Sequence, residues 1–306
     1  MADRASDGAE APGTAAALTP RTLLAALRPK QWTKNVLLFS GLVFALKLDR
    51  ADLLLTSLLA FVVFCLLSSA GYLVNDVVDA AADRLHPLKR KRPIASGALS
   101  VRVALALAAA LAIGALLAAA TVGASFAGVA AFYLAITLAY SNWLKHVVLV
   151  DIFVIASGFV VRAVAGAVAI QVPISPWLYV CTGLVALFIA LAKRRSELTL
   201  LAGNASTHRR NLEHYTVELV DQLIGVVLAV TVMAYTLYTF SAENLPPNHA
   251  MMLTVPPVLY GLFRYLYLAR VQGRGGSPED MLLRDRPLLI TAAVWAVLSV
   301  LILYLS

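Results

Sequence analysis

The chain has little charge for its length. Of its 306 residues only 14% are Asp, Glu, Lys or Arg, and 60% are hydrophobic, whereas soluble domains carry about 25% charged residues. Repeated apolar stretches of about 20 residues are typical of membrane-spanning helices. These stretches lack the alternation of apolar and polar residues that marks an outer-membrane β-barrel. The composition therefore predicts an all-α polytopic membrane protein.

Cysteine is also scarce, and the N-terminus lacks the apolar core of a signal peptide. Cys65 and Cys181 lie inside apolar runs, which indicates two packing residues and neither a disulfide nor a metal motif. Residues 1–20 are rich in Ala, with Pro and Gly, and we expect a disordered cytoplasmic tail there. Residues 21–306 are expected to form one integral membrane domain.

Nine apolar segments are candidates for membrane-spanning helices. The first is the weakest, because its uninterrupted apolar part, 36–46, is short and Pro29 precedes it. The predicted spans are 30–47, 51–75, 100–121, 123–142, 147–170, 175–193, 217–240, 250–270 and 286–305.

The basic residues are distributed unevenly between the two sides of these spans. With the N-terminus in the cytoplasm, 21 of the 25 Lys and Arg residues lie in cytoplasmic segments, and only Lys47 and Arg50 lie in outside loops. This asymmetry follows the positive-inside rule. We therefore interpret the net charge of +8 as a topology signal and not as a sign of nucleic-acid binding. The odd number of spans predicts an external C-terminus.

The stretch NDVVDAAADRLHPLKRKR at 75–92 directly follows the second span. On a helix, Asn75, Asp79 and Asp83 form one stripe, which Asp76 flanks. Side-chain oxygens suit a hard cation such as Mg²⁺, and clustered carboxylates repel one another until a cation relieves them. The spacing therefore predicts a metal site for a diphosphate at the membrane surface. The alternative is a solvated helix end.

Basic side chains near this motif suit phosphate oxygens. Lys89 and Arg92 are expected to turn toward the acids and hold phosphate. Lys193, Arg194 and Glu197 close the sixth span and are candidates for a second polar wall. For both groups the alternative is a basic loop that anchors to anionic lipid headgroups.

Further candidates lie on other spans. Lys30 and Lys34, one turn apart, are candidates for the phosphate of a lipid, and the alternative is a snorkelling membrane edge. Tyr140 and Lys145 end the fourth span. Arg162 lies roughly ten residues into the fifth span, where a charge is costly and usually faces an internal cavity or a partner on another helix.

The acid motif, Asn75-Asp76-x-x-Asp79-x-x-x-Asp83, is followed by Arg92-Pro93 and Gly97. It resembles the first Asp-rich motif of the UbiA superfamily of intramembrane prenyltransferases, and Tyr140 and Lys145 match that family's pattern after the fourth span. The resemblance covers most of the chain. It implies a UbiA-type bundle of nine transmembrane helices with a catalytic site facing the cytoplasm.

The second family motif departs from this pattern. Members of the family typically carry further aspartates there for a second Mg²⁺ on a prenyl diphosphate, whereas this chain reads KRRSEL at 193–198. One acid among three cations favours a ligand with more phosphate charge than one diphosphate.

One branch of the superfamily matches better. RPKQWTKN at 28–35, the stretch 75–97 and AKRRSEL at 192–198 are similar to the actinobacterial decaprenyl-phosphate phosphoribosyltransferases. That branch transfers 5-phosphoribose from phosphoribosyl diphosphate to decaprenyl phosphate, releasing diphosphate, for the arabinan precursors of the cell wall. The resemblance implies a Mg²⁺-dependent enzyme of the bacterial plasma membrane. Its partners would be the two substrates, bilayer lipids and, as an open alternative, further copies of the chain.

Two other functions stay open: prenyl transfer to an aromatic acceptor, and lipid transport without catalysis.

The resemblance also implies roles for individual residues. The expected metal ligands are Asn75, Asp76, Asp79 and Asp83, of which the three aspartates are catalytic. The expected substrate-binding residues are Lys30, Lys34, Asn75, Lys89, Arg92, Tyr140, Lys145, Arg162, Lys193, Arg194 and Glu197.

Overall fold

The computed structural model describes residues 19–87, 89–200, 214–242, 245–273, 281 and 284–305. Every element within these ranges is helical, as the composition predicts. The expected tail at 1–20 lies almost wholly outside them. The elements, in order, are α1 (Pro20–Leu27), η1 (Pro29–Phe39), α2 (Ser40–Phe44), α3 (Ala51–Val78), α4 (Ala80–Leu85), η2 (Lys89–Lys91), α5 (Val101–Val122), α6 (Ala124–Asn142), η3 (Leu144–His146), α7 (Val150–Ala169), α8 (Pro176–Leu200), α10 (Val217–Ser241), η5 (Ala250–Thr254), α11 (Val255–Arg270) and α13 (Arg286–Leu305).

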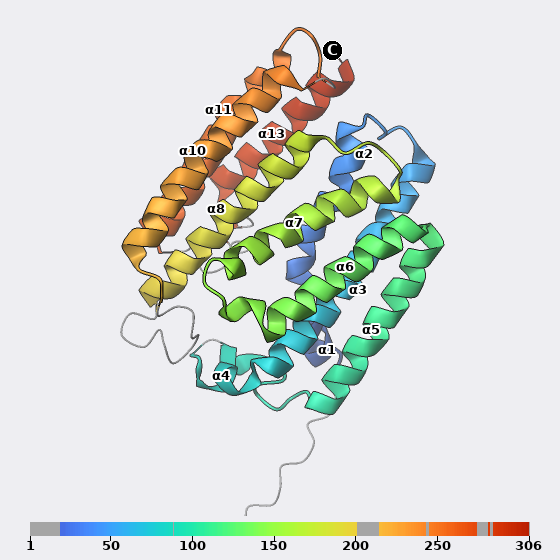
Figure 1. Cartoon of the computed structure of the whole chain (residues 1–306), viewed down its shortest axis with the longest axis vertical. Helices are drawn as coiled ribbons and strands as arrows, with labels where there is room; N and C mark the ends of the chain where they lie inside the picture. Colours follow the sequence, from blue (N-terminus) through green and yellow to red (C-terminus); the bar gives the residue numbers. More distant parts are fainter. Residues whose placement is uncertain are drawn as a thin grey trace, which may run out of the picture.

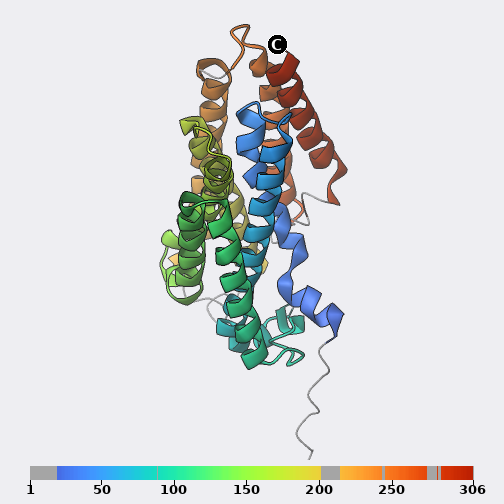
Figure 2. The same cartoon turned by 90° about the vertical axis from the view of Figure 1, so that its right-hand side faces the viewer.

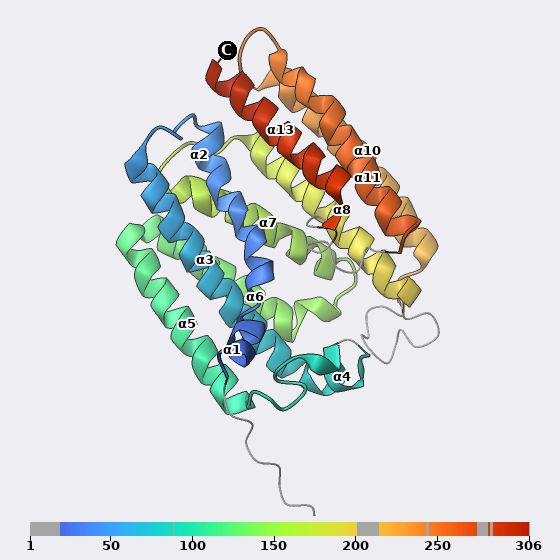
Figure 3. The ribbon, with the colours of Figure 1, turned by 180° about the vertical axis from the view of Figure 1, so that it is seen from behind.

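The long helices form two groups that meet at α7 and α8. Figure 1 shows α3, α5 and α6 on one side of this pair and α10, α11 and α13 on the other. Seen from behind, α2 and the segment before it cross in front of α7 (Figure 3). In the side view the long helices follow the long axis, and α4 lies at the end opposite to the C-terminus (Figure 2).

Seven helices within the described ranges are long and apolar enough to cross a membrane. They correspond to seven of the nine predicted spans, and their boundaries differ from the predicted ones by a few residues. The sequence therefore predicts these elements well, because long apolar runs leave a helix as the way to satisfy backbone hydrogen bonds in lipid.

The other two predicted spans are built from shorter pieces. The segment 30–47 consists of an 11-residue 3₁₀ helix, η1, and the five-residue α2. The segment 250–270 consists of η5 and the 16-residue α11. Polar side chains crowd the start of the first segment, and Pro256 and Pro257 interrupt the second, since proline supplies no backbone N–H. Whether these two segments cross the bilayer stays a prediction.

Very close contacts hold η1 and α2 against α7. A Cβ atom added at Gly166 would lie 1.9 Å from the carbonyl oxygen of Leu38, and one added at Gly41 would lie 2.9 Å from the Cα atom of Ala167. Glycine is therefore required at both contacts for the backbones to approach. This packing fixes the position of the segment that carries Lys30 and Lys34.

The acid motif does not lie on one continuous helix, so that prediction was wrong. α3 ends at Val78, Asp79 caps it with φ −88° and ψ 0°, and α4 begins at Ala80. Aspartate is a poor residue for a helix interior because its side chain competes for backbone groups. The side-chain contacts group the four motif residues into two pairs, Asp76 with Asp83 and Asn75 with Asp79.

Candidate active site

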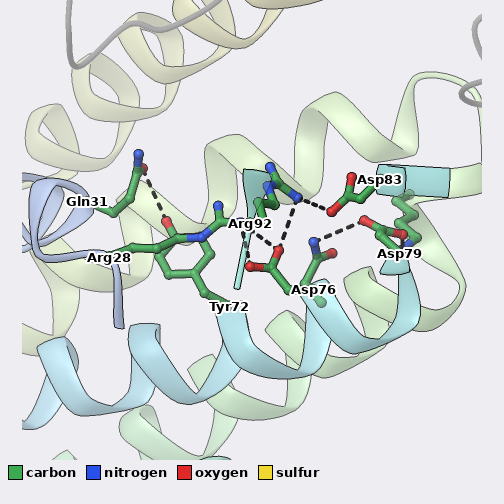
Figure 4. Close-up of polar contacts among 9 residues, drawn as sticks. Arg28, Gln31, Tyr72, Asp76, Asp79, Asp83 and Arg92 are labelled. Atoms are coloured by element: carbon green, nitrogen blue, oxygen red, sulfur yellow. Dashed lines mark hydrogen bonds and ion pairs between the residues drawn. The ribbon is translucent and has the colours of Figure 1, made fainter. Parts of the chain in front are cut away.

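Asp76 lies near the end of α3 and is 3% exposed. Arg28 donates through Nη2 to both of its oxygens, at 2.5 and 2.6 Å, and Arg92 donates through Nη1 at 3.0 Å (Figure 4). Arg28 reaches this position because it joins α1 to η1 with a left-handed backbone, φ 55°, which is uncommon outside glycine. Its guanidinium also lies 5.1 Å from the ring centre of Tyr72.

Arg92 links Asp76 to Asp83. The same nitrogen, Nη1, lies 3.0 Å from Asp76 Oδ1 and 2.6 Å from Asp83 Oδ2, and Asp83 is also 3% exposed. Figure 4 shows the guanidinium between the two carboxylates. The cation relieves the repulsion that two buried carboxylates would otherwise exert on each other.

The second pair of the motif is Asn75 and Asp79. Asn75 Nδ2 donates to Asp79 Oδ2 at 3.0 Å, and Lys145 Nζ donates to Asp79 Oδ1 at 2.5 Å. Lys145, in η3, is 2% exposed. The structure therefore brings Lys145 to the acid motif across 66 residues of sequence. Tyr140 is half-buried near the end of α6.

The donor chemistry of the motif suits a hard cation, because it consists of carboxylate oxygens and one amide. In the described part of the chain, no three His, Cys, Asp or Glu side chains are already grouped as a metal centre. Instead, each carboxylate of the motif contacts a cationic side chain, and the Arg92 nitrogen lies between two of them. The residues fit a divalent cation provided that Arg92 withdraws from this position.

A second polar cluster closes α8. Arg194 is 3% exposed and donates to Asp151 Oδ2 and Glu197 Oε2. Tyr215 donates its hydroxyl to Asp151 Oδ1 at 2.8 Å and accepts from the backbone N–H of Leu149 at 2.7 Å. Burial raises the pKa of the Tyr215 phenol above its ordinary value, so the hydroxyl stays protonated in alkaline solution as well as at neutral pH.

Arg194 therefore connects α7 to the end of α8. Its Nη atoms are occupied by carboxylates, while its buried Nε has no hydrogen-bond partner among the described residues. The predicted contact of Arg194 with a donor phosphate stays a prediction. Lys193 is half-buried, and Glu197 accepts a hydrogen bond from Arg194, three residues before it.

The predicted lipid-phosphate residues lie on η1. Lys30 is exposed, and Lys34 donates to Gln31 Oε1 at 2.7 Å. On the other side of the motif, Lys89 is half-buried in η2, and its backbone N–H donates to His86 Nδ1 at 3.3 Å. Lys30 and Lys34 lie shortly after Arg28 in the sequence, and Lys89 lies shortly before Arg92. Both arginines contact Asp76.

Arg162 contacts the η1 segment and not the acid motif. It is 5% exposed, and its three nitrogens donate to Asn35 Oδ1 at 2.7 Å, Tyr133 OH at 2.6 Å and the Gly158 carbonyl at 2.7 Å. Asn35 is fully buried. These bonds correspond to the alternative given for Arg162, in which it pairs with a partner on another element. Its predicted role in substrate binding stays a prediction.

Several residues of these clusters were not among the predicted site residues, namely Arg28, Asp151 and Tyr215. Arg28 was visible only as one more basic residue before Pro29, and the pairing of Asp151 with Arg194 joins positions 43 residues apart. Tyr215 carried a signal that was available, since it lies at the membrane edge just before the seventh long apolar run.

Comparison with known proteins identifies relatives over most of the length. Residues 36–278 match the UbiA prenyltransferase family. The chain is 35% identical to the decaprenyl-phosphate phosphoribosyltransferase of Mycolicibacterium smegmatis, covering 89% of each protein. It is 36% identical to the enzyme of the same name from Corynebacterium glutamicum, covering 92% of this chain and 87% of the relative.

The fold also matches a solved structure. A UbiA homologue from Archaeoglobus fulgidus, bound to DMAPP and Mg²⁺, superposes with a TM-score of 0.72 over 93% of this chain and 100% of that one. The sequences are 19% identical, so this likeness concerns the fold alone.

Proposed function

Because the chain belongs to the UbiA prenyltransferase family, we propose that it transfers 5-phosphoribose from phosphoribosyl diphosphate to a polyprenyl phosphate such as decaprenyl phosphate. Relatives that carry this activity in their names share 35–36% identity over nearly the whole chain. The observation that carries the proposal is the basic sequence at the end of α8, KRRSEL at 193–198, which holds Lys193 and the buried Arg194 and only one acid, Glu197. A donor with a second phosphate supplies the negative charge that this wall can bind.

Mg²⁺ would be held by Asp76, Asp79 and Asp83, with the side-chain oxygen of Asn75. When bound, it would neutralise the charge that develops on the departing diphosphate. Two observations support this assignment. The motif offers hard oxygen donors, and the cationic Arg92 Nη1 lies between two of them.

The basic residues of the site would bind the donor phosphates. Arg92 would exchange the two carboxylates for phosphate oxygens, which guanidinium groups also bind in bidentate fashion. Lys89 and Lys193 would hold further phosphate oxygens. Arg194 would fix Glu197, so that its carboxylate can accept a hydrogen bond from a ribose hydroxyl.

The acceptor supplies its own nucleophile. A lipid phosphate oxygen is anionic at neutral pH, so the reaction requires no strong general base. The bond from C1 of the ribose to the diphosphate breaks as the bond from C1 to the lipid phosphate forms, and diphosphate leaves. Lys30 and Lys34 would hold the lipid phosphate in line with C1, where placement and charge stabilisation lower the barrier. In-line attack inverts the anomeric centre.

The proposal includes an orientation in the membrane. Nine segments, including η1 with α2 and η5 with α11, would cross the bacterial plasma membrane, with residues 21–306 as one domain. The site and the N-terminus would face the cytoplasm, and the product would enter the synthesis of cell-wall arabinan. Cysteine accessibility at Ser96 and at Asn248, on opposite ends of the molecule, tests this orientation in intact cells.

The activity test uses the purified full-length chain in mixed micelles. Phosphoribosyl diphosphate labelled in the ribose and a polyprenyl phosphate should give one labelled lipid per diphosphate released, in a reaction that EDTA stops. The Asp76→Asn variant serves as the matched inactive control. Transfer of a prenyl group from a prenyl diphosphate to 4-hydroxybenzoate, with no labelled lipid, would establish prenyl transfer instead. Lipid exchange without diphosphate release would indicate a transporter.

A further inference from the structure

An apolar groove of about 580 Å³ runs between α10 and α11, beyond α8 from the acid motif (Figure 1). Its open side presents exposed side chains, which face the bilayer if these helices cross it. Among its lining residues are Gly225, Ala229, Met233 and Leu237 from α10, and Leu259 and Phe263 from α11.

The groove has the length of one lipid chain in one leaflet. Residues 225 to 237 of α10 extend over about 18 Å at 1.5 Å per residue. Half of the hydrocarbon core of a bilayer measures about 15 Å. A chain that enters from the end of the molecule where α8 ends therefore fills the groove and reaches the midplane.

A charged cluster lies next to the groove in sequence, beyond its lining residues at that same end. Asp221 precedes Gly225 by one turn on the same face of α10, and Arg270 follows Phe263 by two turns on α11. Asp221 Oδ1 accepts from Arg195 Nε at 2.7 Å and lies 3.0 Å from Arg270 Nη2. Asp221 and Arg270 therefore belong to the two helices that form the groove, and Arg195 on α8 contacts Asp221.

The cluster carries an excess positive charge. Two guanidinium groups share a single carboxylate oxygen, and neither arginine has another ionic partner in the part of the chain that the structure describes. The side chains of Arg195 and Arg270 are 17% and 35% exposed, and Arg270 Nη2 also donates to the backbone carbonyl of Asp221 at 3.1 Å. A phosphate group at the membrane surface satisfies such donors better than water does.

We propose that this groove and its cluster form a binding site for one anionic phospholipid, with an acyl chain along α10 and the phosphate on Arg195 and Arg270. The site is separate from the proposed transferase chemistry and does not depend on it. A second protein copy is the less suitable occupant, because the cluster beyond the end of the groove carries an unbalanced positive charge.

The charged end is tested with three variants that have opposite expected effects. Arg195→Gln with Arg270→Gln should weaken binding of phosphatidylglycerol about 25-fold, since one basic group near a membrane surface contributes about fivefold. Asp221→Asn should tighten binding about fivefold, because it removes the negative charge that competes with the phosphate. The control is Arg21→Gln with Arg102→Gln, which removes two exposed charges outside the groove.

The apolar part is tested without any change in charge. A Cβ atom added at Gly225 meets nothing within 4 Å, so Gly225→Leu fills the groove while the helix is retained. We expect it to weaken phosphatidylglycerol binding about tenfold, the value of one large apolar contact of about 1.4 kcal/mol. Gly114→Leu on α5, equally open, is the control and should bind as the unchanged chain does.

The measurement is the number and affinity of phosphatidylglycerol molecules retained by the full-length chain, by native mass spectrometry, with phosphatidylcholine as competitor. Tighter binding by Asp221→Asn together with weaker binding by Gly225→Leu supports the site. Equal binding of both lipids, or no effect of Gly225→Leu, overturns it. A change in oligomeric state by Gly225→Leu with unchanged lipid binding would show that a second copy occupies the groove, which also overturns it.

Discussion

Replacing Arg92 by Gln tests two roles of this side chain. In the structure it contacts the carboxylates of Asp76 and Asp83, and in the proposed reaction it binds a phosphate of the donor. In the variant, Asp83 loses its ion pair with Arg92, and Asp76 keeps its ion pair with Arg28. Removing one partner from a fully buried ion pair costs 3–5 kcal/mol. Because the Arg92 side chain is 24% exposed, we expect about 2 kcal/mol here.

This loss predicts that the variant binds a divalent cation more tightly in the absence of donor. A cation between Asp76 and Asp83 no longer has to displace a guanidinium, so about 2 kcal/mol returns as binding energy, or about a 30-fold lower Kd. Without Mg²⁺ the thermal midpoint should fall below that of the unchanged chain, and Mg²⁺ should restore it. At the same time the KM for the diphosphate donor should rise.

Calorimetric titration with Mg²⁺ and thermal unfolding with and without Mg²⁺ measure these effects. Arg90→Gln, an exposed neighbour in η2, is the matched control and should behave as the unchanged chain does. If Arg92→Gln binds Mg²⁺ no better than the control, the carboxylates are not the cation ligands and the reasoning fails.

Four further predictions concern the fold and the site. Gly166→Ala should strongly destabilise the protein, because its new methyl group would meet a backbone oxygen at 1.9 Å, while Gly114→Ala in open space should be neutral or slightly stabilising; thermal midpoints compare the two. Asp76→Asn should abolish diphosphate release with folding intact, and near-normal Mg²⁺-dependent turnover would contradict the metal assignment. Lys145→Met should lower stability by about 2 kcal/mol, because the Asp79 carboxylate, whose side chain is 30% exposed, loses its cation, and neutralising Asp79 in the same chain should recover part of this loss without activity. Tyr215→Phe should cost about 1–3 kcal/mol in unfolding free energy, because the buried Asp151 carboxylate loses one of its hydrogen bonds and the Leu149 backbone N–H loses its acceptor; an unchanged unfolding midpoint would exclude that role.

The sequence was sufficient for the parts of the fold that local patterns determine. Apolar runs located seven long helices, because a chain in lipid must satisfy its backbone hydrogen bonds within each helix. It was also sufficient to select Asp76, Asp83 and Arg92, which are close in sequence and meet in space. Lys145 was selected from a family pattern, and the structure places it on Asp79.

Other features depend on packing between distant segments. The interruption at Asp79 occurs within a pattern that suits a continuous helix, and Lys145 and Asn75 both bond to the carboxylate at the break. The pairing of Asp151 with Arg194 requires α7 and α8 to be adjacent, which no spacing along the chain specifies. Arg162 was expected among the substrate-binding residues, which stays a prediction, and its neutral partner Asn35 on η1 could not be predicted from the sequence.

The pairing of charges in the acid motif has a consequence for the order in which ligands arrive. Three carboxylates, Asp76, Asp79 and Asp83, contact three cationic groups, from Arg28, Arg92 and Lys145. These six groups together have no net charge, so they exert little long-range attraction on a free cation or on a free diphosphate. A cation that arrives alone must displace Arg92 from the carboxylates. A diphosphate that arrives alone draws Arg92 away and leaves these carboxylates without that cationic partner. On the proposed function, a complex of the two would exchange both sets of partners at once, which would make the metal-bound donor the species that the motif receives most readily.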